Sequence, residues 1–99
     1  MAVLMENHVE QSNAEIYDAV AAKLDVEADT PEGMVVHTAI DLGDRGIRIV
    51  DVWESQQAFE AFRDSRLLPA IEAVLSERGI EPMGPPNYEF SEIHHLVTP

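Results

Sequence analysis

The sequence of 99 residues has no cysteine and only six basic residues, against nineteen acidic ones. The absence of cysteine excludes disulfides and thiolate chemistry and is compatible with the reducing cytoplasm, where we expect the protein to work. The formal net charge of −13 repels phosphate backbones and anionic lipid surfaces. Apolar runs are only a few residues long, and phosphate-cradle, nucleophile-elbow and zinc motifs are missing. We therefore expect no nucleic-acid partner, no membrane partner and no bound metal.

The hydrophobic pattern predicts one domain over residues 1–99 with the order strand-helix-strand-strand-helix-strand. Ser12-Asn13-Ala14-Glu15 matches a capping box, which makes Ser12 the expected N-cap of a helix ending near Leu24. Ser55 is the expected N-cap of a second helical region, bent near residues 64–66 and followed by Gly79. The expected strands cover residues 2–8, 34–42, 46–54 and 88–97. This order predicts an α+β fold with an antiparallel sheet.

The two central strands form a predicted hairpin around Gly43-Asp44-Arg45-Gly46. With Asp44 and Arg45 at the tip, His37 lies opposite Val52, and Thr38 is the cross-strand neighbour of Asp51. This register places Asp51 and Thr38 on one face of the hairpin and His37 on the other. Both faces are otherwise largely apolar, and the helices of one domain cover only one face of an antiparallel sheet. We therefore expect a second copy of the chain to cover the other face in a homodimer.

The segment from Ile49 to Phe62 (IVDVWESQQAFEAF), together with the element order, resembles the antibiotic-biosynthesis-monooxygenase class of dimeric α/β barrels. In that class a strand ends in an aromatic residue and Glu-Ser, and a helix with an Ala-Phe pair follows. The resemblance implies a ferredoxin-like βαββαβ sheet in the order 4-1-3-2 and a dimer in which two sheets face each other. It also implies a cleft between sheet and helices. Members include cofactor-independent oxygenases, polyketide cyclases and haem-degrading enzymes.

The haem-degrading branch of that class uses an Asn on the first strand, a Trp in the helix after the hairpin and a His further along. Asn7 matches the first of these by position, whereas Phe62 stands near the Trp position and Glu72 near the His position. Without an imidazole at that place, haem ligation by the branch's motif fails. The comparison therefore implies no haem, and we expect no cofactor.

Polar residues on apolar faces are the candidates for chemistry. Asp51 interrupts a face of Ile, Val, Leu and Trp, and a buried carboxylate needs a partner or a function. His37 and His94 are further candidate proton carriers, since imidazole titrates near neutral pH. The candidate substrate-binding residues are Trp53, Thr38, Asn7, Tyr88 and Phe62. Ordinary structural roles stay open for each of them: Asp51 facing solvent or pairing with an arginine at the dimer interface, Trp53 in the core, and each histidine solvated on a strand.

Three functions remain open on the sequence. The first is a cofactor-free monooxygenase or cyclase acting on a hydrophobic aromatic or polyketide-like molecule. The second is a non-catalytic small-molecule-binding or stress-associated protein, whose sign would be an apolar pocket without a polar group of shifted pKa. The third is a structural dimer subunit without a pocket.

Overall fold

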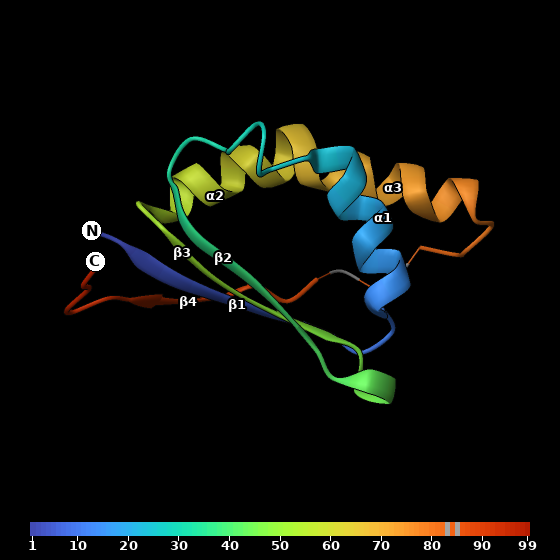
Figure 1. The fold of residues 1–99 in the computed structure, drawn as a ribbon, viewed down its shortest axis with the longest axis horizontal. Helices are drawn as coiled ribbons and strands as arrows, with labels where there is room; N and C mark the ends of the chain where they lie inside the picture. The colour runs from blue at the N-terminus through green and yellow to red at the C-terminus, as the bar shows by residue number, and fades with distance from the viewer. Residues whose placement is uncertain (83, 85) are drawn as a thin grey trace.

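The computed structural model describes residues 1–82, 84 and 86–99, and in this part of the chain it has one antiparallel sheet with helices on one face (Figure 1). The strands pair in the order β2-β3-β1-β4, which is the order that the resemblance implies. The predicted α+β class and the ferredoxin-like succession of elements are confirmed. The elements are β1 (Val3–Val9), α1 (Ala14–Leu24), β2 (Met34–Asp41), β3 (Ile47–Trp53), α2 (Gln56–Phe62), α3 (Leu68–Glu77) and β4 (Glu89–Glu92).

The N-terminus of α1 differs from the expected capping box. The side chain of Asn13, rather than that of Ser12, accepts the backbone N–H of Ile16 at 2.9 Å. The backbone N–H of Ser12 donates to the carbonyl of Val9 at 3.2 Å, so Ser12 belongs to the turn that leaves β1. The helix therefore begins one residue later than predicted. Its end at Leu24 is as predicted, with Asp25 in the left-handed region as C-cap.

The hairpin register was predicted wrongly by one residue. His37 lies opposite Asp51, and Thr38 lies opposite Val50. The tip contains three residues, Gly43–Arg45 in a 3₁₀ turn, because Leu42 already pairs with Gly46 through a 2.9 Å bond. A shift of one residue moves every side chain of a strand to the opposite face. His37 and Asp51 consequently share the face that the helices cover, and Thr38 lies on the outer face.

Gly46 fixes this turn. Its φ of +95° is in the region that favours glycine, and a Cβ there would lie 2.1 Å from the carbonyl oxygen of Val9. Any other residue would push the end of β1 away from the hairpin tip. The close approach of these two backbones therefore depends on the missing side chain.

The second helical region runs on through a π-helical turn, Arg63–Leu67, at the place where a break or bend was predicted. Ser55 caps α2 as predicted, accepting the N–H of Ala58 at 3.1 Å, and Gly79 ends the last turn with a φ of +67°. From the π-turn, Arg66 donates to the backbone carbonyls of Leu24 at 2.9 Å and Asp29 at 3.0 Å. These bonds connect the end of α1 and the loop after it to the π-helical turn of the second helical region.

The core is centred on the end of β3. Trp53 is 0% exposed and contacts Phe59 edge-on, with ring centroids 5.5 Å apart, and Phe62 at 5.4 Å. Met5 completes this buried cluster from β1. Such aromatic pairs add about 0.5–1.5 kcal/mol each to the area they bury. They fasten α2 firmly to the sheet at this end.

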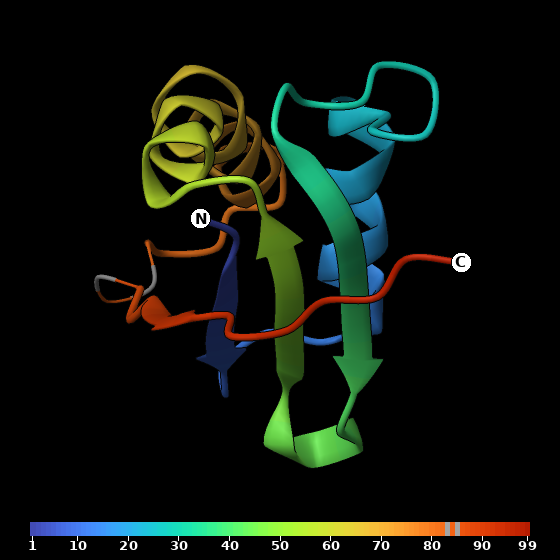
Figure 2. The same cartoon turned by 90° about the vertical axis from the view of Figure 1, so that its left-hand side faces the viewer.

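The outer face of the sheet is the side away from the helices, and β1, β3 and β2 lie side by side on it in Figure 2. Its apolar residues are Leu4, Val36, Ile40, Val50 and Val52. Val36 and Ile40, on the edge strand β2, are each 43% exposed and lie beside the apolar residues of β3. The last strand is shorter than the predicted 88–97, because its pairing with β1 runs out where β1 begins and Ile93 bonds to Ala2 at 3.0 Å.

No helix in the described part of the chain is long and apolar enough to span a membrane.

Candidate active site

A cavity of about 150 Å³ lies between α1, α3 and the covered face of the sheet. Helix α1 packs against α3, and none of its residues is fully buried. Most lining side chains are aliphatic or aromatic. The polar ones are Asn7, Ser12, Tyr17, His37, Asp51 and Tyr88. The molecule therefore has a small apolar chamber with a few polar groups directed into it, the usual composition of a ligand site.

Asp51 sits at the centre of the polar groups and is 3% exposed. Its Oδ1 accepts Nδ1–H of His37 at 2.7 Å and the backbone N–H of Thr38 at 3.3 Å. Its Oδ2 accepts the indole N–H of Trp53 at 3.2 Å. These three donors compensate the burial of the carboxylate and hold it in one orientation. Because both oxygens are engaged, Asp51 is suited to position His37 rather than to take a proton from a ligand.

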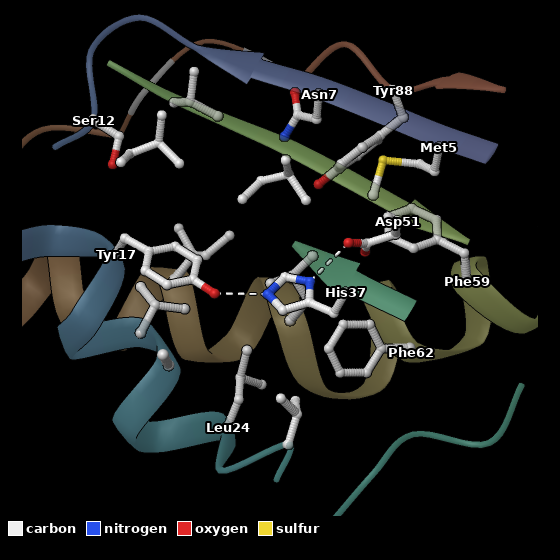
Figure 3. Close-up of a pocket in the computed structure, with 18 of the residues that line it drawn as sticks. Met5, Asn7, Ser12, Tyr17, Leu24, His37, Asp51, Phe59, Phe62 and Tyr88 are labelled. Carbon is white, nitrogen blue, oxygen red and sulfur yellow. Dashed lines mark hydrogen bonds and ion pairs between the residues drawn. The ribbon is translucent and has the colours of Figure 1, made fainter. Parts of the chain in front are cut away.

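His37 is held between Asp51 and Tyr17 (Figure 3). A carboxylate can only accept, so Nδ1 of the neutral imidazole carries the proton and Nε2 is the acceptor. The Tyr17 hydroxyl lies 2.6 Å from Nε2 and donates to it. A short chain of bonds thus runs from Asp51 through His37 to Tyr17. A base oriented by a carboxylate and bonded to a hydroxyl is an arrangement that serves proton transfer.

Tyr17 is a site residue that the sequence does not reveal. Its hydroxyl reaches His37 across the cavity from α1, and its ring stacks at 6.2 Å on the imidazole. Nothing local distinguishes Tyr17 from a core aromatic at helical spacing. Its hydrogen bond to His37 depends on the register of the hairpin, which directs His37 toward the helices.

Two tyrosines of the cavity have shifted pKa values. Burial, together with the negative charge of Asp51 and then of Asp18, raises the pKa of the Tyr17 phenol above its ordinary value. Burial also raises the pKa of Tyr88, with a smaller opposing effect from Arg63. Both groups are therefore neutral phenols at physiological pH, able to donate a hydrogen bond or a proton.

Three of the predicted substrate-binding residues line the cavity: Asn7, Phe62 and Tyr88. Asn7 is 8% exposed, its side chain extends from β1 into the interior, and its amide oxygen has no hydrogen-bond partner among the described residues (Figure 3). The Tyr88 ring packs edge-on against Phe59, and its hydroxyl is directed into the cavity (Figure 3).

The other predicted site residues are placed differently. Trp53 is a core residue that does not line the cavity, and its indole N–H donates to Asp51, which does. Thr38 contributes its backbone N–H, while its hydroxyl donates to the carbonyl of Val50 at 2.6 Å. His94 follows β4, is exposed and does not line the cavity. The structure therefore brings His37 and Asp51 together and leaves His94 apart.

No protein-family model matches the sequence, and no curated protein matches it. Solved structures do match over nearly the whole chain. SnoaB, a cofactor-independent oxygenase from Streptomyces nogalater, is 17% identical with a TM-score of 0.58, over 97% of this chain and 94% of that chain. A monooxygenase from the gene ActVA-Orf6 of Streptomyces coelicolor, in complex with the ligand Nanaomycin D, is 19% identical with a TM-score of 0.58, over 99% and 91%.

A Deinococcus radiodurans protein assigned to the antibiotic biosynthesis monooxygenases is 16% identical with a TM-score of 0.58, over 99% of this chain and 97% of that chain. The chain has the antibiotic-biosynthesis-monooxygenase fold. The resemblance seen in residues 49–62 is thereby confirmed at the level of the fold. NE2512 of Nitrosomonas europaea, a protein of unknown function, has the same fold at 20% identity and a TM-score of 0.60, over 99% and 92%. At these identities the antibiotic-biosynthesis-monooxygenase fold carries no particular reaction with it.

Proposed function

We propose that the protein is a small-molecule enzyme of the cofactor-independent monooxygenase or polyketide-cyclase type, acting on a hydrophobic aromatic or polyketide-like substrate. The observation that carries the proposal is the chain of bonds from Asp51 through His37 to Tyr17, which ends in an apolar cavity. Two neighbours with this fold are an oxygenase and a ligand-bound monooxygenase, which supports the same class of chemistry.

In the proposed first step, Tyr17 takes a proton from an acidic C–H or O–H group of the substrate while passing its own proton to Nε2 of His37. Asp51 stabilises the resulting imidazolium and acts as a positioning residue. The substrate keeps the electron pair of the broken bond as an enolate or phenolate. The mostly apolar lining of the cavity favours this transfer because few side chains there compete for the proton.

The enolate then has two outcomes. In an oxygenase, its carbon supplies electrons to O₂, a C–O bond forms, the peroxide takes back one proton, and loss of water leaves a carbonyl. In a cyclase, the same carbon adds to a carbonyl of the substrate, and the new alkoxide takes the proton back through Tyr17. Both reactions need only the proton-transfer pair of this chain and, for the oxygenase, O₂ as co-reactant.

A non-catalytic binder of the same fold is the alternative. Its expected sign is an apolar pocket without any polar group of shifted pKa. The raised pKa of Tyr17, at the end of an oriented chain of bonds, favours the enzyme over the binder. A purely structural subunit is not expected to contain a pocket, so the presence of the cavity favours a ligand-binding protein.

We further propose that the protein is a cytoplasmic homodimer, each subunit one domain of residues 1–99. The support is the outer face of the sheet, where Val36 and Ile40 are exposed beside Val50 and Val52. A second copy placed face to face would remove this apolar surface from water, at about 25 cal/mol for each Å² covered.

Proton exchange tests the catalytic proposal without requiring the natural substrate. Enolisable aromatic ketones and phenols are incubated anaerobically in D₂O with the protein, and deuterium incorporation is followed by NMR. We expect Tyr17→Phe and His37→Gln to slow the exchange of an accepted compound by about 10²- to 10⁴-fold. His95→Gln, an exposed histidine replaced in the same way, is the matched control. Folded variants that retain the full exchange rate would refute the assignment.

A further inference from the structure

We propose that the cavity binds an uncharged molecule with a single aromatic ring and a polar group at each end, one end at Tyr17 and the other at Asn7. The inference rests on the proposed function, because it names the substrate class of the same site. It is narrower than the aromatic or polyketide-like substrates considered above, and three properties of the cavity support it: its size, its charge and the spacing of its polar ends.

The size of the cavity limits the ligand to about one ring. Its volume is about 150 Å³, and an apolar chamber of that size holds a benzene-sized molecule. Drug-sized ligands occupy pockets of roughly 300–1,000 Å³. The walls at the sheet end are closed by Phe59 and Phe62, which are fixed against Trp53 in the core. A second fused ring at this end would have to displace these packed aromatics.

The charges around the cavity exclude ionised ligands. Among the described residues that line it there is no lysine or arginine, and Asp51 is the single acidic one. An anionic ligand would lose its hydration without gaining a cationic partner, which is costly in a buried site. A cationic ligand would have to share Asp51 with His37, Thr38 and Trp53, whose three hydrogen bonds already compensate the carboxylate. A neutral molecule avoids both penalties.

The two polar ends come from different elements, Asn7 from β1 and Tyr17 from α1, where Tyr17 bonds to His37 of β2. Asn7 lies opposite Ile49 and His37 opposite Asp51, so the two residues are separated by two strand spacings across the sheet and two residues along it. At about 4.8 Å per strand and 3.3 Å per residue, their Cα atoms are about 12 Å apart. The Tyr17 hydroxyl is 2.6 Å from Nε2 of His37, and a one-ring molecule with a polar substituent and a hydrogen bond of about 2.8 Å at each end has a length of the same order as this backbone separation.

Asn7 supplies the second anchor. It is buried on the covered face of the sheet, and its amide oxygen is unpaired within the described part of the chain. A buried polar atom without a partner is destabilising, so a ligand that bonds to it gains affinity. A half-turn of the amide exchanges its two ends, which lets Asn7 accept from a hydroxyl or donate to a carbonyl.

Calorimetric titration of the full chain with four stable probes tests the inference. They are para-hydroxybenzyl alcohol, which has one ring and two polar ends; para-cresol, which lacks the second polar end; para-hydroxybenzoate, which adds a negative charge; and a naphthalenediol, which adds a ring. We expect the benzyl alcohol to bind at least tenfold more tightly than each of the other three. Equal or tighter binding of the benzoate or of the naphthalenediol would overturn the inference.

Asn7→Leu keeps the approximate volume and removes the amide. It should weaken binding of the benzyl alcohol by about tenfold and leave para-cresol unchanged, with Asn87→Leu, an exposed asparagine, as the control. Unchanged binding of the benzyl alcohol to folded Asn7→Leu would also overturn the inference. Binding is measured without turnover, so the two proposals fail separately. If the one-ring probe binds as expected but proton exchange does not depend on His37, the ligand class is supported and the enzyme is refuted. If exchange depends on His37 but occurs only with multi-ring compounds, the enzyme is supported and the ligand class is refuted.

Discussion

Replacing Asp51 by asparagine gives a quantitative prediction, because the change keeps the shape of the side chain and alters its charge and its hydrogen bonding. The carboxylate accepts from His37, Trp53 and the backbone of Thr38. An asparagine in the same place has one accepting oxygen and one donating nitrogen. If the nitrogen replaces Oδ2, it faces the indole N–H of Trp53, 3.2 Å away, and two donors oppose each other. If it replaces Oδ1, it faces Nδ1 of His37 and forces the other tautomer.

Either arrangement loses at least one charge-assisted bond in a site that is 3% exposed. Bonds of this kind contribute about 1.5–3 kcal/mol, so we expect Asp51→Asn to lower the free energy of unfolding by about 2 kcal/mol. For a chain of this length that corresponds to a fall in Tm of roughly 8–16 °C. Exchange of an accepted substrate should fall as well, since His37 loses its orientation.

The assay uses the protein's single tryptophan, Trp53, which is fully buried and bonded to Asp51. Urea unfolding followed by its fluorescence gives the free energy, and the native emission reports the loss of the indole bond. Asp29→Asn is the matched control, because Asp29 pairs with Arg66 at 3.4 Å and its side chain is 80% exposed. Such a pair contributes about 0–1 kcal/mol. If Asp51→Asn costs no more than Asp29→Asn and leaves the native emission unchanged, the bonding described for Asp51 is refuted.

Further predictions concern pH, the hairpin and the outer face. The raised pKa values of Tyr17 and Tyr88 mean that the folded state resists phenol ionisation, so the free energy of unfolding should fall as pH rises above about 10, where unfolded tyrosine ionises. Tyr17→Phe and Tyr88→Phe should each reduce this fall when urea unfolding is measured across pH. An unchanged pH dependence in both variants would contradict the burial of the two phenols. Gly46→Ala should cost about 1–3 kcal/mol, because of its positive φ and the contact with Val9, whereas Gly84→Ala, with open space around it, should stay within about 0.5 kcal/mol. Ile40→Glu on the outer face should convert the dimer to an 11.0 kDa monomer in light scattering, whereas Ala22→Glu, at an exposed position of α1, should leave the dimer intact. A wild-type protein that is a monomer at micromolar concentration would refute the proposed dimer.

Much of the fold follows from local pattern, and the site does not. The alternation of apolar residues, the Ser55 cap and the terminal Gly79 define their elements with information carried by neighbouring residues. The register of the hairpin depends instead on whether its tip has two residues or three, and the packing of Gly46 against Val9 is a contact between distant segments. The third residue of the tip sets the register in which His37 lies opposite Asp51. The role of Tyr17 could not be predicted either, since it depends on the hydrogen bond to His37.

Asp51 is the part of the site that could be recognised in advance. A carboxylate within an apolar strand stands out because burial without partners is costly, and the structure supplies three partners. Two of them come from the neighbouring strand, and the third, Trp53, lies two residues along on the same face. Its sequence position leaves two functional roles open, a general base or a group that orients another, and the hydrogen bonds already made by its oxygens favour the second.

The most direct test of the central proposal is the position of the proton on His37. ¹⁵N NMR of the imidazole rings distinguishes the two neutral tautomers, and the loss of one set of signals in His37→Gln assigns the residue among four histidines. We predict a proton on Nδ1, bonded to Asp51, and an unprotonated Nε2 that accepts from Tyr17. Asp51→Asn should reduce or reverse this preference. A neutral His37 with its proton on Nε2 in the wild-type protein would contradict the proton-transfer chain.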